Sequence, residues 1–245
     1  MRTIRAGDGR NSSNVKKKKG NKKELQMISY ASIKEDEEIN CYIEQGNKSL
    51  GVLGFTEHSK AHATKVARQA ADILKELGYG RKEIELAKIA GYMHDIGNCI
   101  NRIDHAHSGA ILARNLLMER KMPIKQVAKI MTAIGQHDEK TGTPVDAISA
   151  AIILADKTDV RRNRVRNKNK ASFDKHDTVN YAVEHAKLTI DKEKKVILFA
   201  IELDENTCSV MDYFEIFLDR MLMCRKAAER FGMKFKMTAN GSKVC

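Results

Sequence analysis

The feature that most constrains the fold is an almost unbroken helical spacing of apolar residues between Glu57 and Lys157. Apolar side chains recur there at intervals of three and four residues, the period of an α-helix with one buried face. Glycines and prolines divide the pattern into separate segments. We therefore expect a mainly α fold, a helical bundle whose helices span about 57–78, 81–94, 105–120, 123–135 and 144–157.

A shorter helix is expected before this region. Ser32 is followed three residues later by Glu35, which is the spacing of a capping box at a helix start. The spacing of Ile33, Ile39 and Ile43 then predicts a helix that continues to about residue 44.

The basic charge of the chain is concentrated at its start. Residues 1–24 hold nine Lys/Arg and two Asp/Glu, which is +7 of the net +12 of the whole chain. The segment is rich in Gly, Asn and Lys and has no helical or strand period, so we expect a disordered basic tail. A second basic cluster, at 161–168, falls inside the folded region. Both clusters would attract polyanions.

The pattern changes after about residue 175. Two apolar segments that flank a charged turn predict a β-hairpin, and a long amphipathic helix and one or two short strands follow. The expected ranges are 187–190 and 196–203 for the hairpin, 209–231 for the helix, and 234–238 and 243–245 for the strands. We therefore predict a helical domain over 25–175 and a small α+β appendage over 176–245.

Composition limits the class of protein. The five cysteines are scattered and form no CxxC pair, which is typical of free thiols in a reducing compartment. No stretch approaches the roughly 18 apolar residues needed to span a bilayer, and no apolar stretch follows the charged start as in a secretory signal. We expect a soluble cytoplasmic protein without a membrane partner.

Histidine and aspartate recur where the predicted helices begin or end. An isolated histidine at such a place is more often a cap or a surface residue, but an adjacent His-Asp pair before a glycine break indicates metal ligands. Imidazole and carboxylate together suit Mn, Fe, Zn or Ni, whereas carboxylates alone suit Mg. Helix ends that converge on one pocket would let these groups share one or two divalent cations. The residues at these places are His62, His94, Asp95, His105, His107, His137 and Asp156.

In order and spacing these residues resemble the H…HD…D signature of the HD-domain phosphohydrolases. The matching segments are His62 with Val66-Ala67, His94-Asp95-Ile96-Gly97, and Leu154-Ala155-Asp156. The resemblance covers about 57–168. It implies an HD-type helical domain that hydrolyses phosphate esters, often in nucleotides, at a divalent metal centre. It also implies that His62, His94, Asp95 and Asp156 are ligands and that Asp95 bridges two metals.

The resemblance extends to the ligands of the binuclear members of that family. His105, four residues before Gly109, matches the histidine of an HPxxG-like segment, and His137 matches the first histidine of an HHxE-like segment. Ala106 replaces the proline, and Asp138 stands where a second histidine is common. These departures leave one or two metals open, and the six ligands favour two.

The segment after Asp156 is also similar to the corresponding part of ribonuclease Y, in which an Ala-Asp segment leads into an arginine-rich loop. This resemblance implies that four basic residues bind substrate phosphates through charge-assisted contacts. The alternative is a solvated basic loop. The four residues are Lys157, Arg161, Arg162 and Arg164.

Three functions follow from these patterns. We expect a phosphatase or phosphodiesterase that acts on a nucleotide or another small phosphorylated metabolite, with Asp95 and His94 at the catalytic centre. A phosphodiesterase of RNA or single-stranded nucleic acid is the second possibility, although aromatic residues for base stacking are not interleaved with the basic ones. A non-catalytic metal or nucleotide sensor is the third. The segment after 175 carries no motif, and three roles stay open for it: it seals the pocket, pairs two protomers as a homodimer, or completes the core.

Overall fold

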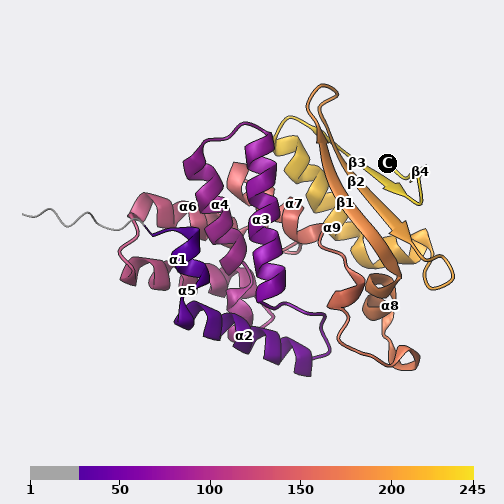
Figure 1. Cartoon of the computed structure of the whole chain (residues 1–245), viewed down its shortest axis with the longest axis horizontal. Coiled ribbons are helices and arrows are strands. Elements are labelled where there is room, and N and C mark those ends of the chain that lie inside the picture. Colours follow the sequence, from indigo (N-terminus) through magenta and orange to yellow (C-terminus); the bar gives the residue numbers. More distant parts are fainter. Residues whose placement is uncertain (1–27) are drawn as a thin grey trace, which may run out of the picture.

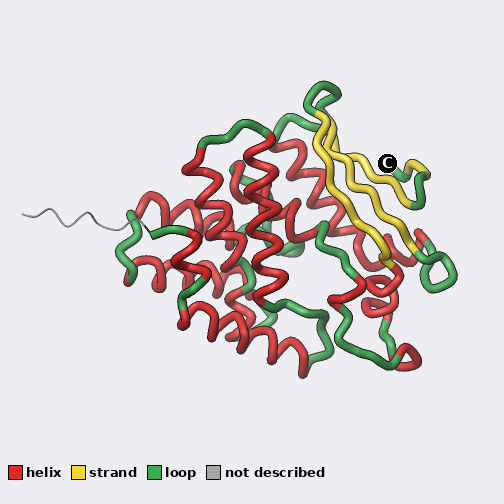
Figure 2. Tube along the Cα trace, viewed as in Figure 1, coloured by secondary structure: helices red, strands yellow, loops and turns green. Residues whose placement is uncertain are grey.

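The computed structural model describes residues 28–245. The predicted basic tail over 1–24 lies outside the described residues. Figures 1 and 2 show helices gathered on one side of the molecule and a small sheet on the other, close to the C-terminus. The mainly α fold with a small α+β part at its C-terminal end is therefore confirmed. In the described part of the chain, no helix is long and apolar enough to cross a membrane.

The helices predicted from the apolar spacing are all present. The structure starts the first long one at Lys60 instead of Glu57, because Ser59 caps it by accepting a hydrogen bond from the backbone of Ala61. A short 3-10 helix, η1 (Ile96–Cys99), follows the fourth α-helix. The α-helices of the N-terminal part are α1 (Tyr30–Lys34), α2 (Glu37–Val52), α3 (Lys60–Glu76), α4 (Arg81–Met93), α5 (His105–Glu119), α6 (Ile124–Gly135) and α7 (Ala147–Lys157).

The predicted helix start at Ser32 is wrong. The capping box is formed by Ser29 and Ser32, and the short helix α1 that it opens ends before Glu35. Asp36 then begins α2, because its carboxylate accepts a hydrogen bond from Ile39 N at 3.1 Å. An Asp is a strong N-cap, so the chain forms two helices in place of one.

The C-terminal part contains the predicted hairpin and long helix together with a helix that the sequence did not indicate. That additional helix, α8, leads into the first strand without a loop. The elements are α8 (Lys175–Ala182), β1 (Val183–Asp191), β2 (Val196–Leu203), α9 (Val210–Arg230), β3 (Lys234–Ala239) and β4 (Ser242–Lys243).

The strands form one sheet in the order β1-β2-β3-β4. β1 and β2 are antiparallel, and α9 is the crossover that brings β3 parallel to β2. Phe199, Ile201, Phe235 and Met237 are buried, and α9 contacts both β2 and β3. The sheet therefore forms an outer layer beyond α9.

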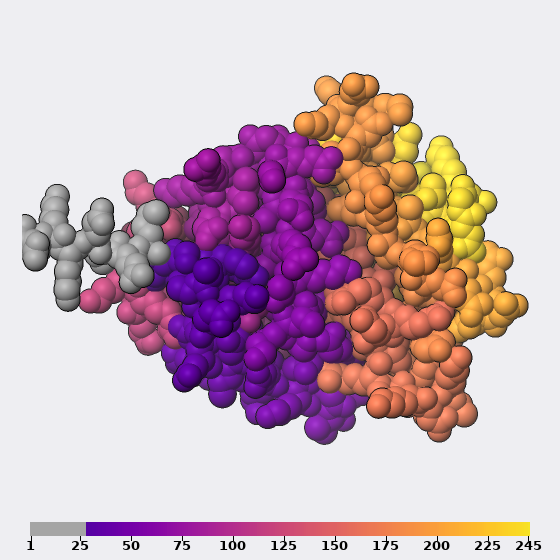
Figure 3. Space-filling model, viewed as in Figure 1, coloured from indigo at the N-terminus to yellow at the C-terminus, as the bar shows by residue number. Residues whose placement is uncertain are grey.

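Helix α7 is the centre of the molecule. Every residue from Ile148 to Ala155 is buried, which is typical of a helix surrounded on all sides. It contacts α3, α4 and α6 on the side of the N-terminal part and α9 on the side of the sheet (Figure 1). One apolar core thus runs through both parts, and in Figure 3 the surface of the C-terminal segments continues directly from that of the helices. The boundary at residues 175 and 176 stays a prediction.

Candidate metal centre

Six side chains from the ends of five helices converge beside the start of η1. All four imidazoles are at least 96% buried, and the two carboxylates are 13% and 14% exposed. The fold therefore brings the predicted ligands together. His62 lies in the first turn of α3, His94 and Asp95 follow α4, His105 begins α5, His137 follows α6, and Asp156 lies in the last turn of α7.

Four of these residues surround a first position. Asp156 Oδ1 lies 3.3 Å from His62 Nε2 and 3.7 Å from His94 Nε2. Asp95 Oδ2 lies 3.1 Å from His94 Nε2 and 3.7 Å from His62 Nε2. Two imidazole nitrogens and two carboxylate oxygens thus face one another at the separations that a shared cation requires.

A second position lies on the other side of Asp95. Asp95 Oδ1 is 3.4 Å from His105 Nε2 and 3.7 Å from His137 Nε2. The two Nε2 atoms are 3.1 Å apart. Asp95 therefore turns one oxygen toward each group of ligands, as a carboxylate that bridges two metals would.

The second nitrogen of every ring fixes the orientation of these ligands. Each Nδ1 faces a carbonyl or carboxylate oxygen, which places the ring proton on Nδ1 and the lone pair on Nε2 in the neutral ring. The acceptors are Asp159 Oδ2 at 2.7 Å for His62, Gly91 O at 2.8 Å for His94, Arg102 O at 3.1 Å for His105 and Ile134 O at 2.6 Å for His137.

This donor set fits a divalent cation. The Nε2 atoms of His62 and His94 are buried and have no hydrogen-bond partner among the described residues. Buried polar atoms are normally satisfied, so unsatisfied nitrogens that point at carboxylates indicate a missing partner. In the neutral rings the Nε2 lone pairs of His105 and His137 face each other at 3.1 Å, and a shared cation would relieve their repulsion. Arg102 Nη1 also lies 3.3 Å from His105 Nε2.

The ionisation of the cluster agrees with this assignment. Burial alone would raise the pKa of Asp95, but His94 and the hydrogen bonds from His105 and His137 hold it well below its usual range. Burial would likewise lower the pKa of His94, but Asp95 and Asp156 raise it to about 10. Burial lowers the pKa of His137 to about 4. The two carboxylates thus favour a proton on His94. A metal bound between these groups would replace that proton.

The turn after Asp95 depends on a glycine. A Cβ at Gly97 would lie 2.6 Å from Gly109 N and 2.7 Å from Ser108 Oγ, and closer still to His105 O. Only a residue without a side chain lets η1 approach α5 this closely. The glycine therefore sets the distance between the His94-Asp95 pair and His105.

Comparison with known proteins agrees with this geometry. Residues 60–161 match the family model described as HD domain. This part of the chain is an HD domain. The match contains all six converging residues and ends before α8. HD domains bind divalent metals and are, as a family, metal-dependent phosphohydrolases. The chain is also 26% identical over 200 residues to the uncharacterized protein MJ1020 of Methanocaldococcus jannaschii, which covers 72% of this chain and 76% of that protein.

The basic residues after Asp156 have partners inside the protein. Lys157 is buried, with Nζ 2.8 Å from Asp156 Oδ2 and 2.6 Å from Glu139 Oε2. Buried cations need such partners, because desolvation without them costs several kcal/mol, about 2–7 for a neutral polar group and more for a charge. Lys157 therefore orients Asp156, a candidate metal ligand of the HD domain, through this ion pair.

The three predicted phosphate-binding arginines also bond to the chain itself. Their partners are Asp159 for Arg161, the carbonyl of Tyr181 for Arg162, and the carbonyls of Glu57 and Asp159 for Arg164. None of them, nor Lys157, lines the cavity that opens beside the HD ligands. Phosphate binding by these four residues thus stays a prediction. The geometry does not support it, because their side-chain donors already bond to groups of the protein.

Two residues that the sequence did not single out for these places lie next to the ligands. Asp159 is fully buried and orients His62, and it follows the ligand Asp156 by three residues, just beyond the end of α7. His58 lines the cavity and stacks edge-on against His62 with ring centroids 5.7 Å apart. The spacing of four between His58 and His62 was the available signal.

A cavity of about 700 Å³ opens beside the HD ligands at His105. One part of its lining comes from the HD domain and the segment before it, and the other comes from α8 and α9. The first part of the lining includes Phe55, His58, Arg102, His105, Glu139 and Lys140, and the second part includes His176, Asn180, Ile216, Phe217 and Arg220.

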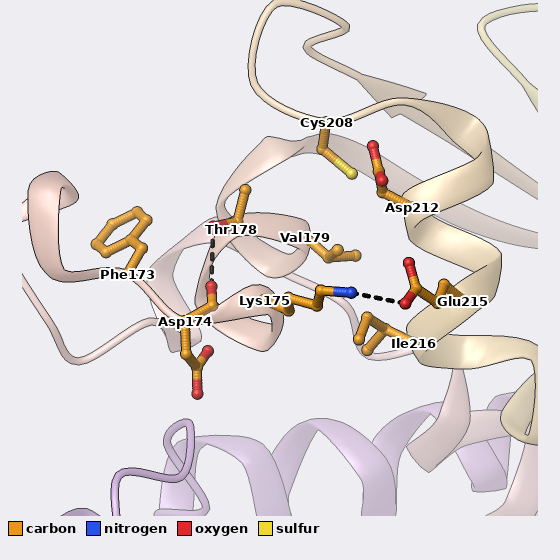
Figure 4. Close-up of a pocket in the computed structure, with 9 residues that line it drawn as sticks. All are labelled: Phe173, Asp174, Lys175, Thr178, Val179, Cys208, Asp212, Glu215 and Ile216. Atoms are coloured by element: carbon orange, nitrogen blue, oxygen red, sulfur yellow. Dashed lines mark hydrogen bonds and ion pairs between the residues drawn. The ribbon is translucent and has the colours of Figure 1, made fainter.

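A smaller cavity of about 280 Å³ lies between α8 and α9. Figure 4 shows Lys175 crossing it to Glu215, with Nζ 2.6 Å from Oε1, and Cys208 at one end. Its lining residues include no histidine and none of the six ligands. The larger cavity is therefore the candidate substrate site.

Proposed function

We propose that this protein is a metal-dependent hydrolase of phosphate esters that acts on a nucleotide or another small phosphorylated metabolite. The observation that carries the proposal is Asp95, which turns one oxygen toward each group of ligands. His105 of the second group lines a cavity. Ligand cavities of about 300–1,000 Å³ are typical for small molecules, and this one has about 700 Å³.

The six residues would hold one or two divalent ions, of Mn, Fe, Zn, Ni or Mg. A cation bound there would polarise a phosphoryl oxygen and lower the pKa of a water molecule. Asp95, between the two groups, would orient that water toward phosphorus. The water oxygen would bond to phosphorus as the bond to the leaving oxygen breaks, and the proton lost by the water would pass to the leaving oxygen. Fixed acceptors hold the Nδ1 protons of His62, His94, His105 and His137. Each ring would therefore present the Nε2 lone pair to a bound cation.

The charge around the cavity favours a small substrate over nucleic acid. Five carboxylates and three cations line it; the carboxylates are those of Asp104, Asp138, Glu139, Asp174 and Asp219, and the cations are Arg102, Lys140 and Arg220. The excess of carboxylates repels a long phosphate backbone, whereas a compact ester can lie between them with its phosphate toward His105. The two aromatic side chains of the lining, Phe55 and Phe217, each already face an arginine, so they do not form a row on which successive bases stack.

Turnover measured on p-nitrophenyl phosphate, bis-p-nitrophenyl phosphate, a nucleotide panel and a short RNA, at several salt concentrations, tests the proposal. We expect hydrolysis of a small ester with a shallow salt dependence, because few phosphate contacts are made. Cleavage of RNA with a steep logarithmic salt slope would favour the nucleic-acid phosphodiesterase. Stoichiometric metal with no hydrolysis of any compound would favour the sensor.

A further inference from the structure

We propose that the C-terminal part completes the substrate site, with Arg220 of α9 and Arg102 of the HD domain binding the same phosphoryl group. The inference rests on the proposed function and adds a residue that lies outside the HD match. It assigns a task to the α+β part, because α9 would bring a phosphate ligand to the metal centre.

Arg220 lies in the wall of the large cavity with unused donors. Its guanidinium is stacked over the ring of Phe217, 4.6 Å from the centroid, which limits its rotation. Its closest acid is Glu139, with Oε1 3.7 Å from Nε, beyond hydrogen-bond distance. Among the described residues Arg220 makes no hydrogen bond, unlike Arg161, Arg162 and Arg164.

A row of alternating charges ties Arg220 to the metal centre. Glu139 lies between Arg220 and Lys157, and Lys157 contacts the ligand Asp156. Each member of the row is at most 23% exposed. Neighbouring opposite charges in a largely buried row restrain one another. The row therefore holds Arg220 near Glu139 and, through Lys157, at a defined distance from Asp156.

Arg102 presents a similar group from the HD side. Its guanidinium carbon lies 5.5 Å from the centroid of the Phe55 ring, and its Nη1 lies 3.3 Å from both Asn98 Oδ1 and His105 Nε2. Its Nε and Nη2 make no hydrogen bond with the described residues. Its Nη1 is 3.9 Å from Asp95 Oδ1. The cavity therefore holds two arginines, each stacked on a phenylalanine, one from each part of the chain.

Two guanidinium groups favour a phosphate monoester over a diester. A monoester carries about two negative charges at neutral pH because its second pKa is about 6, whereas a diester carries one. Planar guanidinium groups bind the oxygens of such a dianion in pairs. The substrate class that we assign is thus a compact phosphate monoester.

The test compares Arg220→Gln and Arg220→Lys with Arg225→Gln, a matched loss of charge at an exposed position of the same helix. Binding of inorganic phosphate to the metal-loaded protein is measured by calorimetry, beside metal content and kinetics on p-nitrophenyl phosphate and its bis ester. We expect both Arg220 variants to keep their metal, to bind phosphate at least tenfold more weakly and to lose more kcat/KM on the monoester than on the diester. Arg225→Gln should match the unaltered protein.

Unchanged phosphate affinity in both Arg220 variants, with native metal content and native circular dichroism, would overturn the inference. A protein that turns over esters normally without Arg220 would likewise overturn it and leave the proposed function standing. A third result is that the unaltered protein hydrolyses no ester, while substitution of Arg220 abolishes phosphate binding. In that case the proposed function fails and the phosphate site stands.

Discussion

At the scale of single residues, the carboxylate of Asp159 shows how a residue that is not a ligand orients one that is. Its Oδ2 accepts the Nδ1 proton of His62 at 2.7 Å, and its Oδ1 lies 2.6 Å from both Lys65 Nζ and Arg161 Nε. Burial would raise its pKa, but His62, Arg164 and Arg161 lower it, so the carboxylate stays charged. A charged carboxylate behind a histidine fixes the ring and makes its other nitrogen a better ligand.

Asp159→Asn should therefore weaken metal binding without removing a ligand. Loss of such a partner typically costs about 10–100-fold in metal affinity or activity, and we expect a decrease in that range. Metal content at limiting metal, and its recovery at excess metal, provide the measurement. Asp72→Asn, at an exposed position of α3, is the control. Native metal affinity in Asp159→Asn would contradict the role assigned to this carboxylate.

Metal binding should release a proton near neutral pH. The pKa of His94 is raised to about 10, so its ring is protonated at pH 7, and its Nε2 must lose that proton to bind a cation. Affinity should then rise with pH throughout the range below about 10, by about tenfold per pH unit for each proton displaced. Calorimetry in two buffers of different ionisation enthalpy counts the protons. A count near zero at pH 7 would contradict the assignment of His94.

The residue types and spacing indicated the candidate ligands. They could not show which groups the nearby basic side chains bind. The adjacent His94 and Asp95 before a glycine were a local signal, readable without the fold. Arg164 donates a hydrogen bond to the carbonyl of Glu57, which is 107 positions away in the sequence. This partner can be identified only from the tertiary fold. A basic segment after a ligand is therefore compatible with a phosphate site and with an internal support.

At the scale of elements, the contact between η1 and α5 sets the geometry of the second group of ligands. Gly97 lies against the start of α5, and a Cβ added at Gly109 would lie only 3.0 Å from Gly97 N. The same turn of α5 carries His105. A shift of α5 would thus move His105 away from Asp95.

Gly97→Ala should destabilise this contact. Forcing extra volume into a packed interior typically costs about 1–3 kcal/mol, and we expect a loss of that size in the free energy of unfolding together with weaker binding of a second metal. Gly135→Ala is the matched control, because its Cβ would lie 3.7 Å from Ala110 Cβ, an ordinary contact. Chemical denaturation with and without metal measures both. Equal stability of the two variants would contradict the packing argument.

The elements themselves were largely predictable, and the exceptions have local causes. Apolar spacing fixed the helices that form the core, because each buries one face or more. Helix α8 was missed because it is short and passes directly into β1 at Val183. The break at Asp36 was missed because the apolar spacing of Ile33, Ile39 and Ile43 continues across it.

At the scale of the whole molecule, α7 joins the HD domain to the C-terminal part. Its buried residues contact α3 and α4 on one side and α9 on the other, so one core includes Ile152 as well as Phe217. A change of sequence pattern near residue 175 indicated an appendage, because periodicity reports local structure and not the packing between segments.

The protein should consequently unfold in one cooperative transition. Domains that share a continuous core lose it together, whereas independent domains give separate transitions. Circular dichroism reports mainly on the helices, and a fluorescent label at exposed Cys245 reports on the C-terminal part. Coincident denaturation curves from the two probes are the expected result. Two separated midpoints would show that the parts unfold independently.

The most direct test of the metal-dependent hydrolase is metal analysis of the purified protein and its Asp95→Ala variant, paired with turnover on p-nitrophenyl phosphate at matched metal loading. The bridging position of Asp95 predicts about two equivalents of metal per chain, and in Asp95→Ala the loss of the second equivalent and of more than about 99% of turnover. Near-normal turnover of Asp95→Ala, or neither bound metal nor turnover in the unaltered protein under any supplementation, would contradict the account.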